Sequence, residues 1–250
     1  MFDLIVSLSI SDAVLIVITA ILVGMGKTGL QGSGLVVVPL LAVVYGGRNS
    51  SGLLLPMLVI ADLFAVYYYN RHAVWKYIWR LVPSTILGIF IGIYVGEVID
   101  DDTFKVIMAV IVLLSLGIMI WRESNHSKHE IPESWWFAGL LGLAGGFATM
   151  IGNAAGPVMA VYFLSMRLPK NIYIGTGAWF FLLMNLFKVP FHVFVWKSIS
   201  IQTFSLNLIM IPFILLGAYI GIIVVKKIPE KPYRIFIIVV TAIVAIRLFF

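Results

Sequence analysis

The sequence of 250 residues contains no cysteine, and only 11% of its residues are charged. The absence of cysteine excludes disulfides, thiolate metal sites and thiol chemistry. The scarcity of charge excludes a water-soluble globule, because 62% of the residues are hydrophobic and the mean hydropathy is +1.08. Apolar runs of about 20 residues recur along the chain and match a bilayer core. The sequence therefore predicts an all-α polytopic membrane protein.

The sequence also lacks the residue groupings that intramembrane enzymes need. We see no paired carboxylates, no His/Glu metal-ligand spacing and no Ser/His arrangement within one membrane layer. We therefore expect no enzymatic activity, no cofactor and no bound metal. A cation permease is disfavoured too, since Asp62 is its only credible ligand. The net charge of +6 is explained by loop charges that set topology, so membrane lipid is expected as a partner and nucleic acid is not.

Polar breaks divide the chain into about ten membrane segments. Their expected ranges are 4–24, 32–46, 51–69, 80–98, 104–121, 134–151, 154–166, 173–195, 203–225 and 233–250. The first contains Asp12 and lacks both a basic start and a cleavage site, so it is interpreted as a membrane segment rather than a signal peptide. The second and seventh are too short for a full crossing. We expect each to form a broken or re-entrant pair with the segment before it.

The chain divides into two similar halves. Residues 1–121 form a first transmembrane repeat, residues 122–133 a polar cytoplasmic linker, and residues 134–250 a second repeat. Pro83, Gly88 and Gly92 recur as Pro212, Gly217 and Gly221 at a separation of 129 residues, and Gly34 and Asn49 recur as Gly156 and Asn171 at 122. Five segments per half is an odd number, so the second repeat is expected to have inverted topology.

The loop charges orient the chain in the membrane. If loops alternate sides, twelve basic residues, Lys27 among them, fall on one side and five, Lys188 among them, on the other. The side with more basic residues is cytoplasmic by the positive-inside rule. We therefore expect a multi-pass protein of the cell inner or plasma membrane with both termini extracytoplasmic.

Two glycine-rich breaks occupy matching places in the halves, at residues 24–34 and 145–157. A helix that starts inside a membrane leaves backbone N–H groups without partners and carries a partial positive charge at its N-terminus. Two such N-termini facing each other near the midplane would form an anion cradle. The alternative is that these small residues only permit close helix packing.

The candidate substrate-binding residues lie in and beside the two breaks. They are Gln31, Gly32, Ser33 and Gly34 in the first, Gly152, Asn153, Ala154, Ala155 and Gly156 in the second, with Lys27, Thr28, Thr149, Thr176 and Asn185 nearby. Pro157 suits a first helical turn, where its missing N–H costs nothing. His192 is expected to be solvated near the outer interface, and Trp196 to belong to an interfacial aromatic belt.

Two charges lie at membrane depth, where charges are expensive and usually functional. Lys27, inside the first break, either supplies a full positive charge for the substrate or extends to the cytoplasmic surface as an anchor. Asp62 is the coupling candidate, because protonation would remove its desolvation cost. A static ion pair with a lysine explains Asp62 equally well.

The first break, Gly24-x-Gly-Lys-x-Gly-x-x-Gly-Ser-Gly followed by residues 36–40, resembles the opening motif of the sulfite exporter TauE/SafE family of anion permeases. The runs 152–157, 162–164, 175–181 and 185–188 are similar to the matching part of that family. The resemblance covers residues 20–250. It implies ion-gradient-driven export of sulfite or a small organosulfonate such as sulfoacetate, with residues 31–34 and 152–156 as the substrate site.

We therefore expect a secondary transporter that moves a small anion by alternating access. A passive anion channel is the first alternative, since helix dipoles also line pores, and an intramembrane lipid-modifying enzyme is a weaker one. The patterns Gly88-x-x-x-Gly92 and Gly217-x-x-x-Gly221 leave a homo-oligomer open, because they can pack within one chain or between two.

Overall fold

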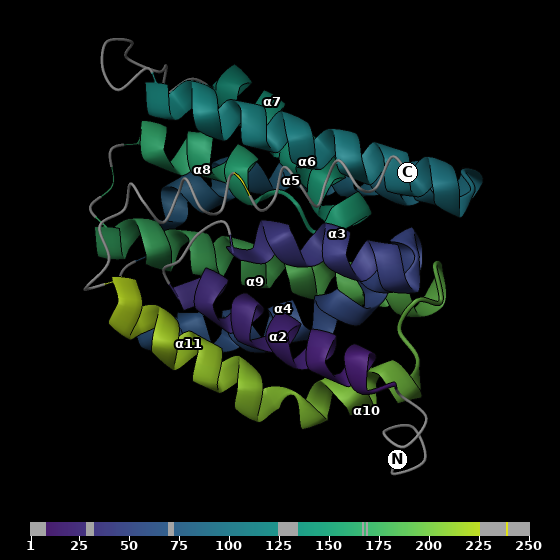
Figure 1. Ribbon diagram of the computed structural model, residues 1–250. Coiled ribbons are helices and arrows are strands. Elements are labelled where there is room, and N and C mark those ends of the chain that lie inside the picture. Colours follow the sequence, from purple (N-terminus) through teal and green to yellow (C-terminus); the bar gives the residue numbers. More distant parts are fainter. Residues whose placement is uncertain are drawn as a thin grey trace.

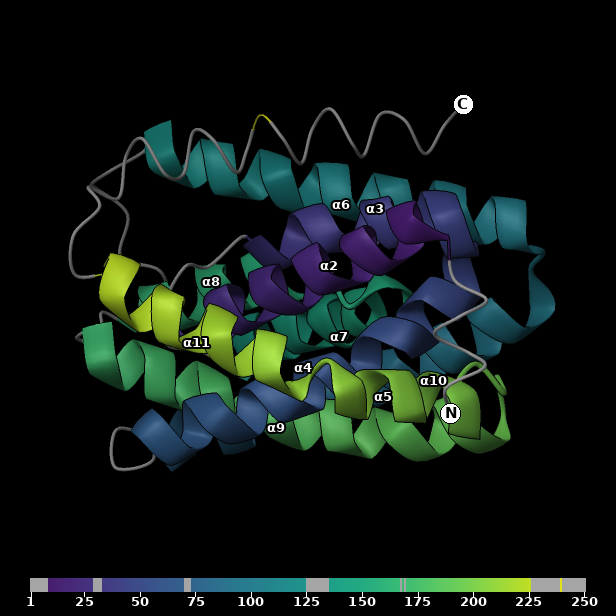
Figure 2. The ribbon, with the colours of Figure 1, turned by 60° about the horizontal axis from the view of Figure 1, so that its bottom comes forward.

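The computed structural model describes residues 9–28, 33–69, 73–124, 135–166, 168, 170–225 and 239, and every structural statement below concerns these residues. They form α-helices joined by short connections, and no strand occurs among them. The helices lie roughly side by side in one bundle (Figures 1 and 2). The first half contains α2 (Ile10–Thr28), α3 (Ser33–Tyr45), α4 (Gly47–Tyr69), α5 (Trp75–Val98) and α6 (Asp101–Ser124). The second half contains α7 (Trp135–Gly152), α8 (Gly156–Ser165), α9 (Lys170–Phe194), α10 (Ile201–Ile209) and α11 (Ile211–Val225).

Each predicted segment that falls within the described part of the chain is helical. Five helices, α2, α4, α5, α7 and α9, are long and apolar enough to cross a membrane. The predicted segment 203–225 is split into α10 and α11, which meet at 49° and together make a sixth candidate span. Pro212 lies in the first turn of α11, where its missing N–H interrupts helical hydrogen bonding. The predicted segment 233–250 lies outside the described residues except for position 239.

The glycine-rich stretches are helical over much of their length. α2 continues to Thr28, so Gly24 and Lys27 are helical, and α7 continues to Gly152. The predicted segment 134–151 therefore corresponds closely to α7, whereas α2 extends four residues past the predicted end of segment 4–24. At a rise of 1.5 Å per residue, α3 and α8 are only about 20 Å and about 15 Å long, which is too short to cross the bilayer alone.

Glycines hold α5 against α7. A Cβ added to Gly88 of α5 would collide with the carbonyl oxygen of Leu143, and one added to Gly146 of α7 would collide with that of Thr85. The backbones therefore touch, and the contact between these two helices is among the most extensive in the described bundle. This close approach explains why a helical segment carries so many glycines.

The same arrangement joins α2 to α11, which lie side by side at the lower edge of Figure 1. A Cβ on Gly24 would collide with the carbonyl oxygen of Ile214, and one on Gly217 with that of Ile21. The small-residue patterns therefore pack within one chain, which settles the question that the sequence left open for them. A homo-oligomer stays a prediction.

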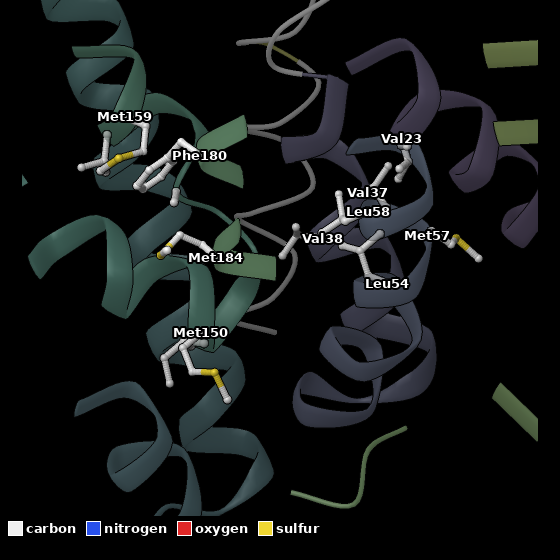
Figure 3. Close-up of a cluster of buried hydrophobic side chains, with 14 of the residues drawn as sticks. Val23, Val37, Val38, Leu54, Met57, Leu58, Met150, Met159, Phe180 and Met184 are labelled. Carbon is white, nitrogen blue, oxygen red and sulfur yellow. The ribbon is translucent and has the colours of Figure 1, made fainter. Parts of the chain in front are cut away.

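α4 and α9 pack against each other and contact both of these glycine-joined pairs (Figure 1). Their apolar side chains belong to one buried cluster that draws on both halves of the chain. Figure 3 shows Leu54 and Leu58 of α4 on one side and Met184 of α9 on the other, with Val38 of α3 between them. Val38 and Leu54 are 3% and 2% exposed. The first part of α3 is thus enclosed by the bundle, whereas Val43 and Val44 near its end are 40% and 47% exposed.

Three connections meet at one end of the bundle. The Arg48 guanidinium donates to the carbonyl oxygen of Ile99 (3.1 Å), and the Phe104 ring packs edge-on against Trp196. Asp100 caps α6 by accepting a hydrogen bond from the N–H of Thr103 (2.7 Å), and this bond lowers the pKa of the Asp100 carboxyl. The connections between α3 and α4, α5 and α6, and α9 and α10 therefore share one side, as alternating loops require.

Candidate functional site

The α7–α8 break lies in the interior of the bundle. α7 ends where Asn153 adopts a left-handed conformation (φ 53°), and the N–H of Ala154 turns back to the carbonyl oxygen of Ala148 (3.2 Å). Ala154 and Ala155 are 0% and 1% exposed. α8 then begins at Gly156, with Pro157 in its first turn as the sequence predicts.

Gly156 is the open position of this break. It is exposed, and no described atom lies within 4 Å of the place that a Cβ would occupy. Gly152, by contrast, is buried, and a Cβ there would lie 2.9 Å from the side chain of Met108. The break is thus filled at its α7 end and open where α8 starts. A small ligand can approach the α8 backbone at that point.

Lys188 of α9 contacts the break through its ammonium group. Its side chain is 0% exposed, and its Nζ donates to Asn153 Oδ1 (2.7 Å) and to both the carbonyl oxygen and Oγ1 of Thr149 (2.9 Å each). Asn153 in turn donates from Nδ2 to Oγ (3.1 Å) and the carbonyl oxygen (3.2 Å) of Ser51 on α4. These bonds tie α4, α7 and α9 together at the break.

A second polar group lies further along α4 and α9. Asp62 is 0% exposed, and its Oδ1 lies 2.8 Å from the Nζ of Lys27, whose side chain is 16% exposed. The Asn185 amide donates to the other oxygen of Asp62 (2.6 Å), and the Lys27 ammonium lies 4.4 Å from the centre of the Phe181 ring. Lys27 therefore faces the protein interior rather than extending to the cytoplasmic surface. The hypothesis of an Asp62–lysine ion pair is confirmed.

The three threonines among the predicted substrate-binding residues form hydrogen bonds within the protein. The Thr28 hydroxyl donates to the carbonyl oxygen of Ala218 on α11 (2.9 Å), and the Thr28 carbonyl accepts from Tyr69. The Thr176 hydroxyl accepts from the N–H of Val74 (3.0 Å) at the start of α5. Thr28 and Thr176 thus join helices, whereas Thr149 belongs to the group around Lys188.

The first break is described only at its edges. α3 begins at Ser33, with Gly34 in its first turn, while Gln31 and Gly32 lie outside the described residues. The facing of two helix N-termini, which the sequence predicts for an anion cradle, therefore stays a prediction.

Two predictions near the outer interface are wrong. His192 is 0% exposed rather than solvated, and its Nδ1 lies 2.8 Å from Ser198 Oγ. Trp196 is 6% exposed and donates to the carbonyl oxygen of Ile93 (3.3 Å), so it belongs to the core rather than to an exposed belt. The chain after α9 folds back on the last turn of this helix, where the N–H groups of Ser198 and Ile199 donate to the carbonyl oxygen of His192 (2.9 and 3.2 Å).

Sequence reasoning missed Ser51 and gave Lys188 no role of its own. Lys188 lies inside the predicted segment 173–195, so the rule that selected Asp62 as an intramembrane charge applied to it equally. It was counted among the loop charges instead, although it is fully buried. Ser51 carries no signal in the sequence, because its role depends on Asn153, about 100 residues away. Among the described residues, no group of three or more His, Cys, Asp and Glu side chains could hold a metal ion.

Comparison with known proteins identifies one family. The family model described as sulfite exporter TauE/SafE matches residues 15–248, nearly the whole chain. No curated protein and no solved structure matches.

Proposed function

Because the chain belongs to the sulfite exporter TauE/SafE family, whose members are transporters, we propose that it is a secondary transporter of a small sulfur-containing anion. Its proposed substrates are sulfite and organosulfonates such as sulfoacetate, which it exports by alternating access with coupling to an ion gradient. Family membership and the apolar helices make it a multi-pass membrane protein. The inner or plasma membrane and the extracytoplasmic termini remain part of the proposal.

The observation that carries the proposal is the interior α7–α8 break. A helix that begins inside the bundle at an exposed glycine presents backbone N–H groups and the positive end of its dipole to a ligand. Lipid cannot satisfy such groups, whereas an oxyanion accepts hydrogen bonds from several of them at once. The residues of the second break from Gly152 to Gly156 are proposed to bind the anion together with residues 31–34 of the first.

Glycine contacts support an inverted repeat. The repeat relates α7 to α2 at a separation of 122 residues and α5 to α11 at a separation of 129 residues. At these separations Gly146 corresponds to Gly24 and Thr85 to Ile214. Gly146 contacts Thr85, and Gly24 likewise contacts Ile214. The same separations relate the contact of Gly88 with Leu143 to that of Gly217 with Ile21. We propose that the two five-segment halves are related by this symmetry and move against each other around the breaks.

Asp62 remains the coupling candidate in this scheme. Its carboxylate is held by Lys27 of α2 and by Asn185 of α9, so it connects the two proposed repeats. Protonation of Asp62 would remove the charge that holds Lys27 and would loosen α2 from α4. A proton gradient could act on the conformation through this pair.

The test is flux through the purified protein in proteoliposomes, with sulfite, sulfoacetate, sulfate and chloride supplied separately. We expect uptake of sulfite or a sulfonate that is stimulated by unlabelled substrate on the opposite side and by an imposed pH gradient. Flux without counterflow stimulation would identify the passive channel. The absence of flux for every anion would refute the assignment.

Variants at the break connect the flux to the site. Asn153→Gly keeps the left-handed backbone and removes the side-chain amide, so we expect it to lower sulfite flux at least about tenfold, the loss typical of hydrogen bonds to a charged ligand. Ser33→Ala is expected to lower flux as well. The matched control is Gln202→Ala, which removes an exposed polar side chain from α10 and should leave flux unchanged.

A further inference from the structure

Lys188 has complete hydrogen bonding but no balancing charge among the described residues. Its three partners are neutral oxygens: Asn153 Oδ1 at 2.7 Å, and the carbonyl oxygen and Oγ1 of Thr149 at 2.9 Å each. An ammonium has three donors and no acceptor, so these three oxygens match it one for one. The described part of the chain places no carboxylate in an ion pair with it.

The neighbouring charges do not compensate. Asp62 lies 2.8 Å from the ammonium of Lys27 and also accepts a hydrogen bond from Asn185. Among the residues that the structure describes, this buried region therefore holds two lysines and one carboxylate, and the carboxylate is paired with Lys27. A buried cation without an anion carries a large desolvation cost, which an incoming anion would offset.

We propose that Lys188, not Lys27, is the fixed cation that binds the transported anion; this rests on the proposed function. The connection to the break is Asn153, which belongs to it and lies against the Lys188 ammonium. An oxyanion that enters beside Gly156 binds by replacing the neutral Asn153 oxygen on Nζ and accepts a hydrogen bond from the Asn153 amide nitrogen. The charge-assisted contact strengthens as the anion balances Lys188, so the site favours anions over neutral analogues of the same shape.

The experiment measures equilibrium binding of sulfite and of sulfoacetate to the purified protein in detergent. Lys188→Met removes the charge while keeping an unbranched apolar side chain. We expect it to raise the Kd at least about tenfold, the loss typical of a hydrogen bond to a charged group. The matched control is Lys76→Met, since Lys76 is an exposed lysine on α5 and its removal should leave the Kd unchanged.

A second variant keeps the test decisive if Lys188→Met fails to fold. Asn153→Asp places a carboxylate against the ammonium without changing the size of the side chain. Because this internal anion competes with the substrate, we expect the Kd for sulfite to rise at least about tenfold while the unfolding temperature does not fall below that of the wild type. A purely structural role for Lys188 predicts higher stability with an unchanged Kd.

The outcomes separate the two proposals. Wild-type protein that neither binds nor moves any of the tested anions would contradict the proposed function. Wild-type protein that binds sulfite, together with folded Lys188→Met or Asn153→Asp protein of the same affinity, would overturn the role of Lys188 and leave the function standing.

Discussion

The ion pair of Lys27 and Asp62 is a residue-scale feature with a large expected effect on stability. Asp62 is fully buried, so removing its partner leaves an uncompensated carboxylate in the core. We predict that Lys27→Met lowers the free energy of unfolding by about 3–5 kcal/mol. Adding Asp62→Asn should recover most of that loss, because the neutral amide carries no buried charge. Chemical denaturation in detergent measures all three variants.

The exposed pair of Lys105 with Asp101 is the control. Its Nζ–Oδ2 distance is 3.2 Å, but the two side chains are 28% and 46% exposed. Water screens such a pair, so Lys105→Met should change stability by only about 0–1 kcal/mol. Additive losses in the Lys27 and Asp62 double variant would show that the two groups do not stabilise the fold as a pair.

For individual residues, the sequence indicated some of the charges at membrane depth but not their partners or their burial. Asp62 was recognisable as a buried charge because it interrupts an apolar run, whereas for Lys27, inside the first break, the sequence left both an interior and a surface position open. Their pairing was one of several open hypotheses, since Lys188 was an equally suitable partner in the sequence. His192 was misplaced because it follows a lysine and a proline, whereas the chain beyond α9 folds back and buries it.

At the scale of helices, the glycine contacts between α5 and α7 give a direct prediction. Gly88→Ala places a methyl group against the backbone of α7, which cannot rotate away as a side chain would. We expect the variant to be less stable by about 1–3 kcal/mol, the usual cost of overpacking. The unfolding temperature in detergent provides the measurement.

Gly139→Ala is the matched control on α7. No described atom lies within 4 Å of a Cβ at Gly139, so the substitution meets open space. Alanine is the better helix former, by about 0.5–1 kcal/mol, and the variant should be as stable as the wild type or slightly more stable. Equal losses at Gly88 and Gly139 would show that helix propensity, not close packing, determines the effect.

The helices themselves were predictable because an apolar run of membrane length has few alternatives to a helix. The residues at which the helices end beside the two breaks were not predictable. Gly24 and Gly146 serve helix packing, whereas Gly156 begins a helix at an open position. Glycine lacks a side chain in both roles, so composition cannot distinguish a packing glycine from one that admits a ligand.

At the scale of the whole molecule, the predicted topology can be tested with single cysteines, since the chain has none of its own. We expect Asp102→Cys to react with a membrane-impermeant maleimide in intact cells, because Asp102 is 95% exposed beside the connections assigned to the outer side. Ser127→Cys, in the predicted cytoplasmic linker, should react only after permeabilisation. The reverse pattern would contradict the assigned orientation, although not the fold.

The burial of Lys188 does not change the predicted orientation of the chain in the membrane. Lys188 counted among the five basic residues of the outer side, and its removal from the loops lowers that number to four. Lys27 leaves the cytoplasmic set for the same reason, which leaves eleven. The asymmetry is as strong as before, because most of the basic residues lie in the polar linker and the connections between segments.

Hydropathy along the chain, by itself, determined the membrane location, the helical class and the position of nearly every helix, because these depend on runs of neighbouring residues. The family motif was also readable locally. Only the tertiary structure decided which charges pair and which glycines touch, because those contacts join α4 to α9 and α5 to α7 across long stretches of chain. The free energy of a buried charge depends on the atoms around it, and a linear sequence does not contain their positions.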